Sequence, residues 1–475
     1  MVYQSYLWIL GFSVISLACF AESLSLDTYL KYVDATSPYL QRSHYLMAQY
    51  DAKAESARRK QAWLLSGDAH WTRESPSPAN RLFESPSPRT QTGISTQLSK
   101  PIWATGGQVS VTHSLHKFEQ KSSPLSLLGS QQSMQPNPLY RRSFGLSYRH
   151  PLMQNTTGTQ SKLDYELAKS TIKYHRILRA ETDESFRLNQ YNNYLIWAHY
   201  YAKALIINDR LMLATALYAD NQAKYSNNLI EGLELLQSKH YLNQQKMGNS
   251  QAKLMLKSHQ SQLASALNYP AILTSTPNLN LYKIPNLNTA PMTHSWRVIE
   301  TLVAQKNTNQ LLQNALSDQQ KPKLDIVINA DWHDRLNAQN RVSDYGLMDK
   351  QVMLEFSTPL GRQSIRAELD ALSHEAHGIQ QTINHELNQQ IAHKNQLESD
   401  YQRLRMHYNL QTTAVDLHRQ MVNEEQRLYE QGRRSLTFVL QSQDAEHVAK
   451  LAVLETAVHL HRIVAEHNAL LDRLP

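Results

Sequence analysis

Proline is absent from two stretches of this chain that are each more than 100 residues long. No proline lies between Pro151 and Pro270, and none lies between Pro359 and the final Pro475. Because proline is the strongest helix breaker, these stretches permit helices far longer than the usual dozen residues. Gly and Pro are also scarce overall, with 14 and 17 in 475 residues. This composition favours long helices over a compact enzyme-like domain.

The two proline-free stretches carry a similar motif at one fixed offset of 204 residues. The first reads YSNNLIEGLELLQS from Tyr225, and the second reads YEQGRRSLTFVLQS from Tyr429. Each stretch also opens with a Pro-Leu step, at Pro151 and at Pro359. We therefore expect an internal duplication, with a first repeat over 22–275 and a second over 276–475. The clearest identities are Tyr225 with Tyr429, Leu236 with Leu440, Gln237 with Gln441 and Ser238 with Ser442.

Apolar residues in the second stretch recur at steps of three and four. Such a narrow apolar seam is typical of helices that pair like coiled coils. The first stretch repeats the pattern, and a helix from Lys162 to about Tyr225 would be roughly 95 Å long at 1.5 Å per residue. The residues of the second seam are Ile365, Leu369, Leu372, Ala376, Ile379, Ile383 and Leu387.

The repeated motif interrupts the helical pattern late in each stretch. Gly432, and Asn228 at the matching place, can adopt the left-handed conformation that ends a helix. The hydroxyl of Ser435 can cap the helix that follows. The motif therefore predicts the tip of a helical hairpin, and a slight kink in one continuous helix is the alternative.

Ahead of the second helical stretch the period changes from about 3.6 to 2. Residues 324–333 alternate between apolar and polar side chains, and residues 351–357 alternate again. The two segments predict a β-hairpin.

The first half offers 66–74 and 143–150 as the counterparts of this hairpin. Residues 92–118 are a further hairpin candidate, and the loop 74–89 is expected to be exposed and irregular. Two segments in each half give four strands per chain.

The N-terminal segment predicts export from the cytoplasm. Residues 7–20 are apolar, too short to span a bilayer and followed by Ala21, which is typical of a signal peptide, here over 1–21. The single cysteine is Cys19, where lipidation is the less favoured alternative to ordinary cleavage. Cleavage after Ala21 leaves a chain without thiols, so neither disulfides nor cysteine-bound metals can hold it together.

An exported chain with strand pairs, long helical hairpins and an internal duplication resembles the TolC family of outer-membrane efflux proteins. The resemblance covers almost the whole mature chain. Its specific carriers are the Pro-Leu steps, the tips at 225–228 and 429–435, and the helical start around Ser37-Pro38-Tyr39-Leu40. The first tip departs from the family pattern, because Asn228 replaces the usual Gly and Glu231 replaces a small residue.

The resemblance implies an outer-membrane homotrimer whose helices form a coiled-coil-like tunnel in the periplasm. The implied fold class is mostly α with a β-barrel part. Strands in lipid must close into a barrel, and four strands are too few, so three copies would supply twelve. Family members are passive exit ducts that join an inner-membrane transporter through a periplasmic adaptor (membrane fusion) protein. Drug, metal, peptide and protein exporters share this scaffold, so the sequence leaves efflux and type I secretion both open.

The resemblance also implies a gate of polar links near the tips. By residue-wise match it involves Tyr429 and Arg434 on the inner helical pair and Glu234 on the outer pair. The specific hypothesis is a bridge between Glu234 and Arg434 on neighbouring hairpins. The alternative is a pair of solvated charges, worth only about 0 to 1 kcal/mol. An acidic ring found in the family would fall at Phe438 and Gln441, and neither residue is acidic.

The duplicated tips are also expected to bind the adaptor. Three chains would present six related hairpin ends, which suits repeated contacts with a partner. The residues expected to make these contacts are Tyr225, Asn228, Leu229, Gly432, Arg433 and Ser435.

Other classes of function find little support in the sequence. Among the 21 histidines, His374 and His377 stand three apart, whereas the HExxH zinc pattern places its histidines four apart on one helix face. The sequence contains no glycine-rich phosphate loop and no nucleophile motif, and no Lys/Arg cluster stands out despite a net charge of +7. We expect no catalysis, cofactor, metal or nucleic-acid partner. The rival reading is a periplasmic coiled-coil scaffold or adaptor without a pore.

Overall fold

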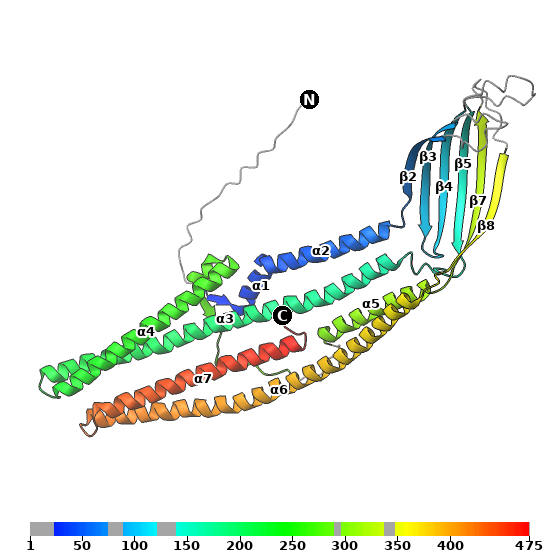
Figure 1. Ribbon diagram of the computed structural model, residues 1–475. Helices are drawn as coiled ribbons and strands as arrows, with labels where there is room; N and C mark the ends of the chain where they lie inside the picture. Colours follow the sequence, from blue (N-terminus) through cyan, green and yellow to red (C-terminus); the bar gives the residue numbers. More distant parts are fainter. Residues whose placement is uncertain (1–22, 75–88, 121–138, 289–295, 337–346, 475) are drawn as a thin grey trace, which may run out of the picture. The chain divides into compact units, whose positions relative to one another are not determined.

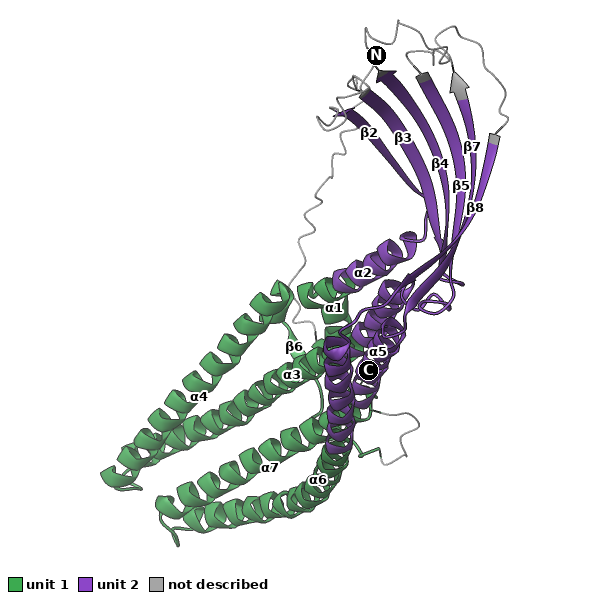
Figure 2. Ribbon diagram, turned by 45° about the vertical axis from the view of Figure 1, so that its right-hand side comes forward, with its two compact units in different colours: residues 1–44, 179–298, 386–475 green, residues 45–178, 299–385 purple. Residues whose placement is uncertain are grey.

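The computed structural model describes residues 23–74, 89–120, 139–288, 296–336 and 347–474. The predicted signal peptide, Cys19 and most of the predicted loop 74–89 lie outside these residues. Two compact units are present, and each draws on both halves of the chain (Figure 2). The predicted repeats 22–275 and 276–475 stay a prediction. Unit 1 comprises residues 1–44, 179–298 and 386–475, and unit 2 comprises residues 45–178 and 299–385.

Two helices dominate the chain, and each is followed by a shorter helix that runs back along it (Figure 1). Helix α3 (Leu163–Ser226) has 64 residues and precedes α4 (Gly232–Leu267). Helix α6 (Gln363–Glu430) has 68 residues and precedes α7 (Leu436–Leu470). The predicted long helices and hairpins are therefore confirmed. Among the described residues, no helix is long and apolar enough to cross a membrane.

The remaining elements of unit 1 form a small core against α3 and α4. Helix α1 (Leu26–Thr36) follows β1 (Ser23–Ser25), which pairs in parallel with β6 (Thr276–Asn278). The buried Tyr194 on α3 holds this pair: its hydroxyl donates to the carbonyl of Leu24 at 2.7 Å and accepts from the Asn278 N–H at 3.1 Å. Unit 1 also contains η3 (Pro270–Leu273), whereas most of α2 (Pro38–Arg59) and of α5 (Arg297–Gln319) belongs to unit 2.

Unit 2 contains a six-stranded sheet in the order β2-β3-β4-β5-β7-β8, with every neighbouring pair antiparallel (Figure 2). The predicted count of four strands is therefore wrong, because the candidate hairpin 92–118 forms two full strands. Three copies of this sheet would supply eighteen strands rather than the predicted twelve. The strands are β2 (Leu64–Glu74), β3 (Arg89–Ile102), β4 (Gly107–Gln120), β5 (Leu139–Pro151), β7 (Lys323–Leu336) and β8 (Leu347–Ser357).

The two faces of this sheet differ in chemistry. On one face the strands are joined by polar pairs, including Ser147 with Asn329 at 2.6 Å and Arg149 with Asp325 at 2.9 Å. The opposite face carries large apolar side chains that remain exposed. Among them are Trp71, Ile94, Leu98, Leu115, Phe144, Leu146, Ile328, Val352, Leu354 and Phe356. Alternation along each strand produces the two faces, because successive side chains point to opposite sides.

The two helical hairpins pack together within unit 1. Leu195 on α3 and Leu454 on α7 are fully buried in one shared cluster. A second cluster joins Leu217 on α3 to Tyr429 at the end of α6 and to Leu436 at the start of α7. These apolar contacts hold the two hairpin tips beside each other and so position the candidate site.

Candidate functional site at the hairpin tips

The second tip ends α6 with two hydrogen bonds of the Schellman type. Gly432 has φ of 69°, and its N–H donates to the Tyr429 carbonyl at 2.9 Å. The next N–H, of Arg433, donates to the Leu428 carbonyl at 2.9 Å. These bonds satisfy carbonyls at the end of the helix that have no N–H donor within the helix. The predicted left-handed conformation at Gly432 is confirmed.

The first tip has the same backbone at the same offset of 204 residues. Asn228 has φ of 55°, and its N–H donates to the Tyr225 carbonyl at 3.0 Å. The N–H of Leu229 donates to the Lys224 carbonyl at 2.9 Å. Asparagine tolerates this conformation better than most residues with a side chain. Both motifs therefore end their helices, and the alternative of a kink in one continuous helix is wrong.

The helices that follow the tips also begin at equivalent positions. Glu231 and Ser435 are the N-cap residues of α4 and α7, both with extended backbone. Neither side chain makes a cap hydrogen bond within the described chain. The predicted cap by the Ser435 hydroxyl is therefore wrong. Its backbone carbonyl, rather than its hydroxyl, accepts a bond here, from the Phe438 N–H at 3.2 Å.

Tyr429 links the two hairpins through its hydroxyl. The side chain is 7% exposed, and the hydroxyl lies 3.0 Å from Oδ1 of Asn221 and 3.3 Å from Oε2 of Glu234, both acceptors on the first hairpin. Burial, together with the nearby Glu234 carboxylate, raises the pKa of Tyr429 to about 12. Nζ of Lys224 lies 5.1 Å from the centre of the ring. The structure thus brings two of the predicted gate residues, Tyr429 and Glu234, into contact.

Arg434, the third predicted gate residue, makes its contacts on its own hairpin. Its Nε lies 3.4 Å from Oε2 of Glu425, and its guanidinium lies 4.4 Å from the centre of the Phe438 ring. Within the described residues of one chain, Glu234 and Arg434 are not paired. Their predicted bridge between neighbouring hairpins of different copies stays a prediction.

Two residues of this site, Asn221 and Glu425, were not among the predicted gate residues. They occupy equivalent positions, because the offset of 204 residues relates one to the other. Asn221 is fully buried and accepts from Tyr429, whereas Glu425 pairs with Arg434. Extending the repeated motif four residues upstream of each tyrosine would have identified both.

The residues expected to contact an adaptor are all exposed. They lie at the ends of the hairpins, and Tyr225 is 47% exposed whereas its equivalent Tyr429 is buried. A Cβ added to Gly432 would meet nothing within 4 Å. The exposed set is Tyr225, Asn228, Leu229, Gly432, Arg433 and Ser435.

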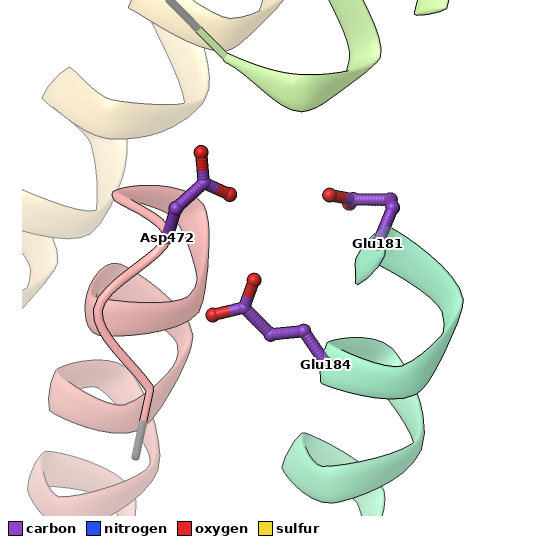
Figure 3. Close-up of side chains that lie close together, drawn as sticks. All are labelled: Glu181, Glu184 and Asp472. Atoms are coloured by element: carbon purple, nitrogen blue, oxygen red, sulfur yellow. The ribbon is translucent and has the colours of Figure 1, made fainter. Parts of the chain in front are cut away.

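A separate cluster of carboxylates lies elsewhere in unit 1. Glu181 and Glu184 on α3 face Asp472, which follows α7, and their ligand atoms lie within 4.8 Å of one another (Figure 3). Burial raises the pKa of Glu181 and of Glu184. Arg297 contacts Glu184 and lies 3.5 Å from Asp472, and the N–H of Leu474 donates to Glu184 at 3.2 Å. This arginine supplies positive charge to the cluster, which ties the end of the chain to α3.

No protein-family model matches the chain. No curated protein matches it. Solved structures do. The outer membrane channel CmeC from Campylobacter jejuni is 13% identical with a TM-score of 0.65, over 94% of this chain and 85% of that chain. The outer membrane protein VceC from Vibrio cholerae is 12% identical with a TM-score of 0.64, over 94% of each chain. The chain has the fold of these outer-membrane channels. The resemblance to the TolC family is therefore confirmed at the level of the fold.

The open state of a third channel shares this fold. The MtrE outer membrane channel from Neisseria gonorrhoeae is 11% identical with a TM-score of 0.60, over 94% of this chain and 88% of that chain. The likeness thus extends over nearly the whole chain.

Proposed function

We propose that the chain forms an outer-membrane channel, a passive exit duct whose helices extend into the periplasm. The observation that carries the proposal is the sheet, which has one exposed apolar face and one polar face. An apolar outside and a polar inside are the pattern of strands that stand between lipid and water. The shared fold with solved outer-membrane channels supports the same function.

The channel needs more than one copy of the chain. The sheet ends in two edge strands, β2 and β8, whose outer N–H and C=O groups have no neighbouring strand in the described chain. Lipid cannot satisfy such groups, so a sheet in a membrane must close. An even number of antiparallel strands leaves the two edges running in opposite directions, so β8 of one copy can pair antiparallel with β2 of the next. We propose closure by a homotrimer.

The periplasmic tips are proposed to meet a periplasmic adaptor, which joins the duct to an inner-membrane transporter. The exposed residues at both tips suit such contacts, and energy for transport would come from these partners. Tyr429, Glu234 and Arg434 are proposed to hold the tip closed. Opening would then be a shift between two populations of tip conformation rather than a chemical step. The scaffold serves efflux pumps and type I secretion systems alike.

Membrane fractionation followed by electrophoresis with and without heating tests the proposal. The protein should be found in the outer membrane and migrate as a heat-dissociable trimer, and the purified trimer should conduct ions in planar bilayers. A soluble monomer in the periplasm would instead favour the rival, a coiled-coil scaffold or adaptor without a pore.

A further inference from the structure

The hairpin of β3 and β4 is built into the sheet as firmly as its neighbours. It lies between β2 and β5. The two strands pair with each other over their full lengths, and β3 pairs with β2 over 89–99 and β4 with β5 over 108–118. β3 and β4 have 14 residues each, against 11 in each of the edge strands β2 and β8. The hairpin is therefore part of the wall and not a surface loop.

The turn of this hairpin is anchored to the junction between β5 and α3. The amide Nδ2 of Asn155 donates to the Gly106 carbonyl at 3.3 Å, and the backbone N–H of Asn155 donates to Asp318 at 2.8 Å. Gly158 has φ of 69°, and a Cβ there would overlap the Trp103 carbonyl oxygen. The backbone approach at Gly158 therefore requires glycine. These contacts fix the end of the hairpin at the point where the helices begin.

The hairpin also has two different faces, with fewer apolar residues on the apolar side of β3, where threonines alternate with Ile94 and Leu98. Ile94 on β3 is 58% exposed and lies on the same face as Leu115 on β4. On the opposite face most side chains of the hairpin are neutral and polar, and His116 and Phe118 lie on this face as well. The polar ones include Ser95, Gln97, Ser99, Ser110, Thr112 and Ser114. Such a strand pair suits lipid on one side and water on the other.

We propose that the β3–β4 hairpin widens the outer-membrane barrel from twelve strands to eighteen. The inference rests on the proposed function, because it requires three copies of the chain to close the sheet. Barrel diameter grows roughly linearly with strand number, so eighteen strands give a diameter roughly 1.5 times that of twelve. Barrels of 16 to 18 strands leave an aqueous channel. The hairpin adds mainly hydroxyl and amide groups to the polar face, on which the other strands carry charged residues such as Arg149, Asp325 and Glu355. The wider duct therefore suits bulky water-soluble cargo.

Single-cysteine variants test the position of the hairpin directly, because Cys19 is the only cysteine and lies in the predicted signal peptide. An environment-sensitive fluorophore would be attached at Ile94→Cys on β3, at Val352→Cys on the same face of β8, and at Gln97→Cys on the opposite face of β3. The labelled protein is placed in vesicles that contain brominated phospholipid. Quenching by the lipid is expected at residues 94 and 352 to a similar extent, and iodide in the water should quench only the label at 97.

The control on β8 distinguishes a failure of the proposed membrane channel from a failure of the proposed position of the β3–β4 hairpin. If the label at 352 is quenched by lipid but the label at 94 only by iodide, a membrane channel exists and the widening hairpin is refuted. If neither position meets lipid, the proposed function itself fails. Electron cryo-microscopy of the trimer gives an independent count. A cross-section of the barrel should show eighteen strands, and twelve strands with hairpins outside the wall would overturn the inference.

Discussion

Replacing Tyr429 with Phe removes one hydroxyl and keeps the aromatic ring in its cluster. The hydroxyl lies 3.0 Å from Asn221, which is fully buried, and 3.3 Å from Glu234. Leaving a buried acceptor without its partner costs about 1–3 kcal/mol. We expect the free energy of local opening at the tip to fall by about this amount, which corresponds to roughly 5- to 150-fold in an equilibrium constant.

Hydrogen exchange measured by mass spectrometry on the detergent-solubilised protein detects such an opening. Backbone amides exchange through local opening events whose free energies differ across a structure. Peptides that contain the end of α6, the start of α7 and the segment of α3 around Asn221 should lose protection in Tyr429→Phe. Peptides from the sheet of unit 2 should keep it, because they share no partner with the hydroxyl.

Tyr225→Phe is the matched control. It makes the same chemical change at the equivalent position of the first tip, where the side chain is 47% exposed and not in the cluster. We expect no loss of protection in this variant. If the two variants give equal exchange, the Tyr429 hydroxyl does not hold the hairpins together, and its proposed part in the gate would be refuted.

Three further variants address the tips and the pH response. Gly432→Val should destabilise the tip by about 1–2 kcal/mol, because a β-branched side chain resists the left-handed conformation. Gly432→Asn should be tolerated, as Asn228 is at the first tip. Equal exchange protection in the two variants would contradict this prediction. Arg434→Ser and Glu234→Gln should each raise single-channel conductance in planar bilayers. Unchanged conductance in both variants would show that Glu234 and Arg434 are solvated surface charges and not part of a gate. Burial and the nearby Arg210 lower the pKa of His447 to about 4. Between pH 6.5, the ordinary pKa of histidine, and pH 4, this residue is protonated in the unfolded chain but not in the folded one. The free energy of unfolding should therefore fall as the pH falls from about 6.5 to about 4. The unfolding temperature should drop less between pH 7 and pH 4.5 in His447→Gln than in the parent protein. An equal drop in both proteins would refute the assigned role of His447.

The helical hairpins could be predicted closely because their signals are local. Freedom from proline, the apolar seam and the left-handed residues act within a few positions along the chain. The first long helix begins at Leu163 against a predicted Lys162, and the turns at Asn228 and Gly432 have the expected conformation. The cap at Ser435 was wrong because a serine before a helix offers a hydroxyl but does not fix its rotamer.

The full sheet could not be predicted in the same way. In β3 the face that is apolar elsewhere carries Thr90, Thr92 and Thr96 among its members, so hydrophobic alternation is weak there. Pairing with β2 and β5 on either side defines these strands, and that information comes from other parts of the chain. The same holds for the contact between Tyr429 and Asn221, which are 208 residues apart. Only the packing of one hairpin on the other brings them together.

The two tips have the same backbone conformation and different chemistries. At equivalent positions the first hairpin has Asn221 and Glu234 where the second has Glu425 and Phe438. The first hairpin therefore supplies acceptors to Tyr429, whereas on the second Arg434 pairs with Glu425 and stacks on Phe438. Because the backbones match, these differences are not caused by the fold of each tip. In the proposed trimer, where hairpins of neighbouring chains alternate around a ring, the contacts within a chain and between chains would therefore differ, and the proposed gate would open at one set of contacts while the other set stays closed.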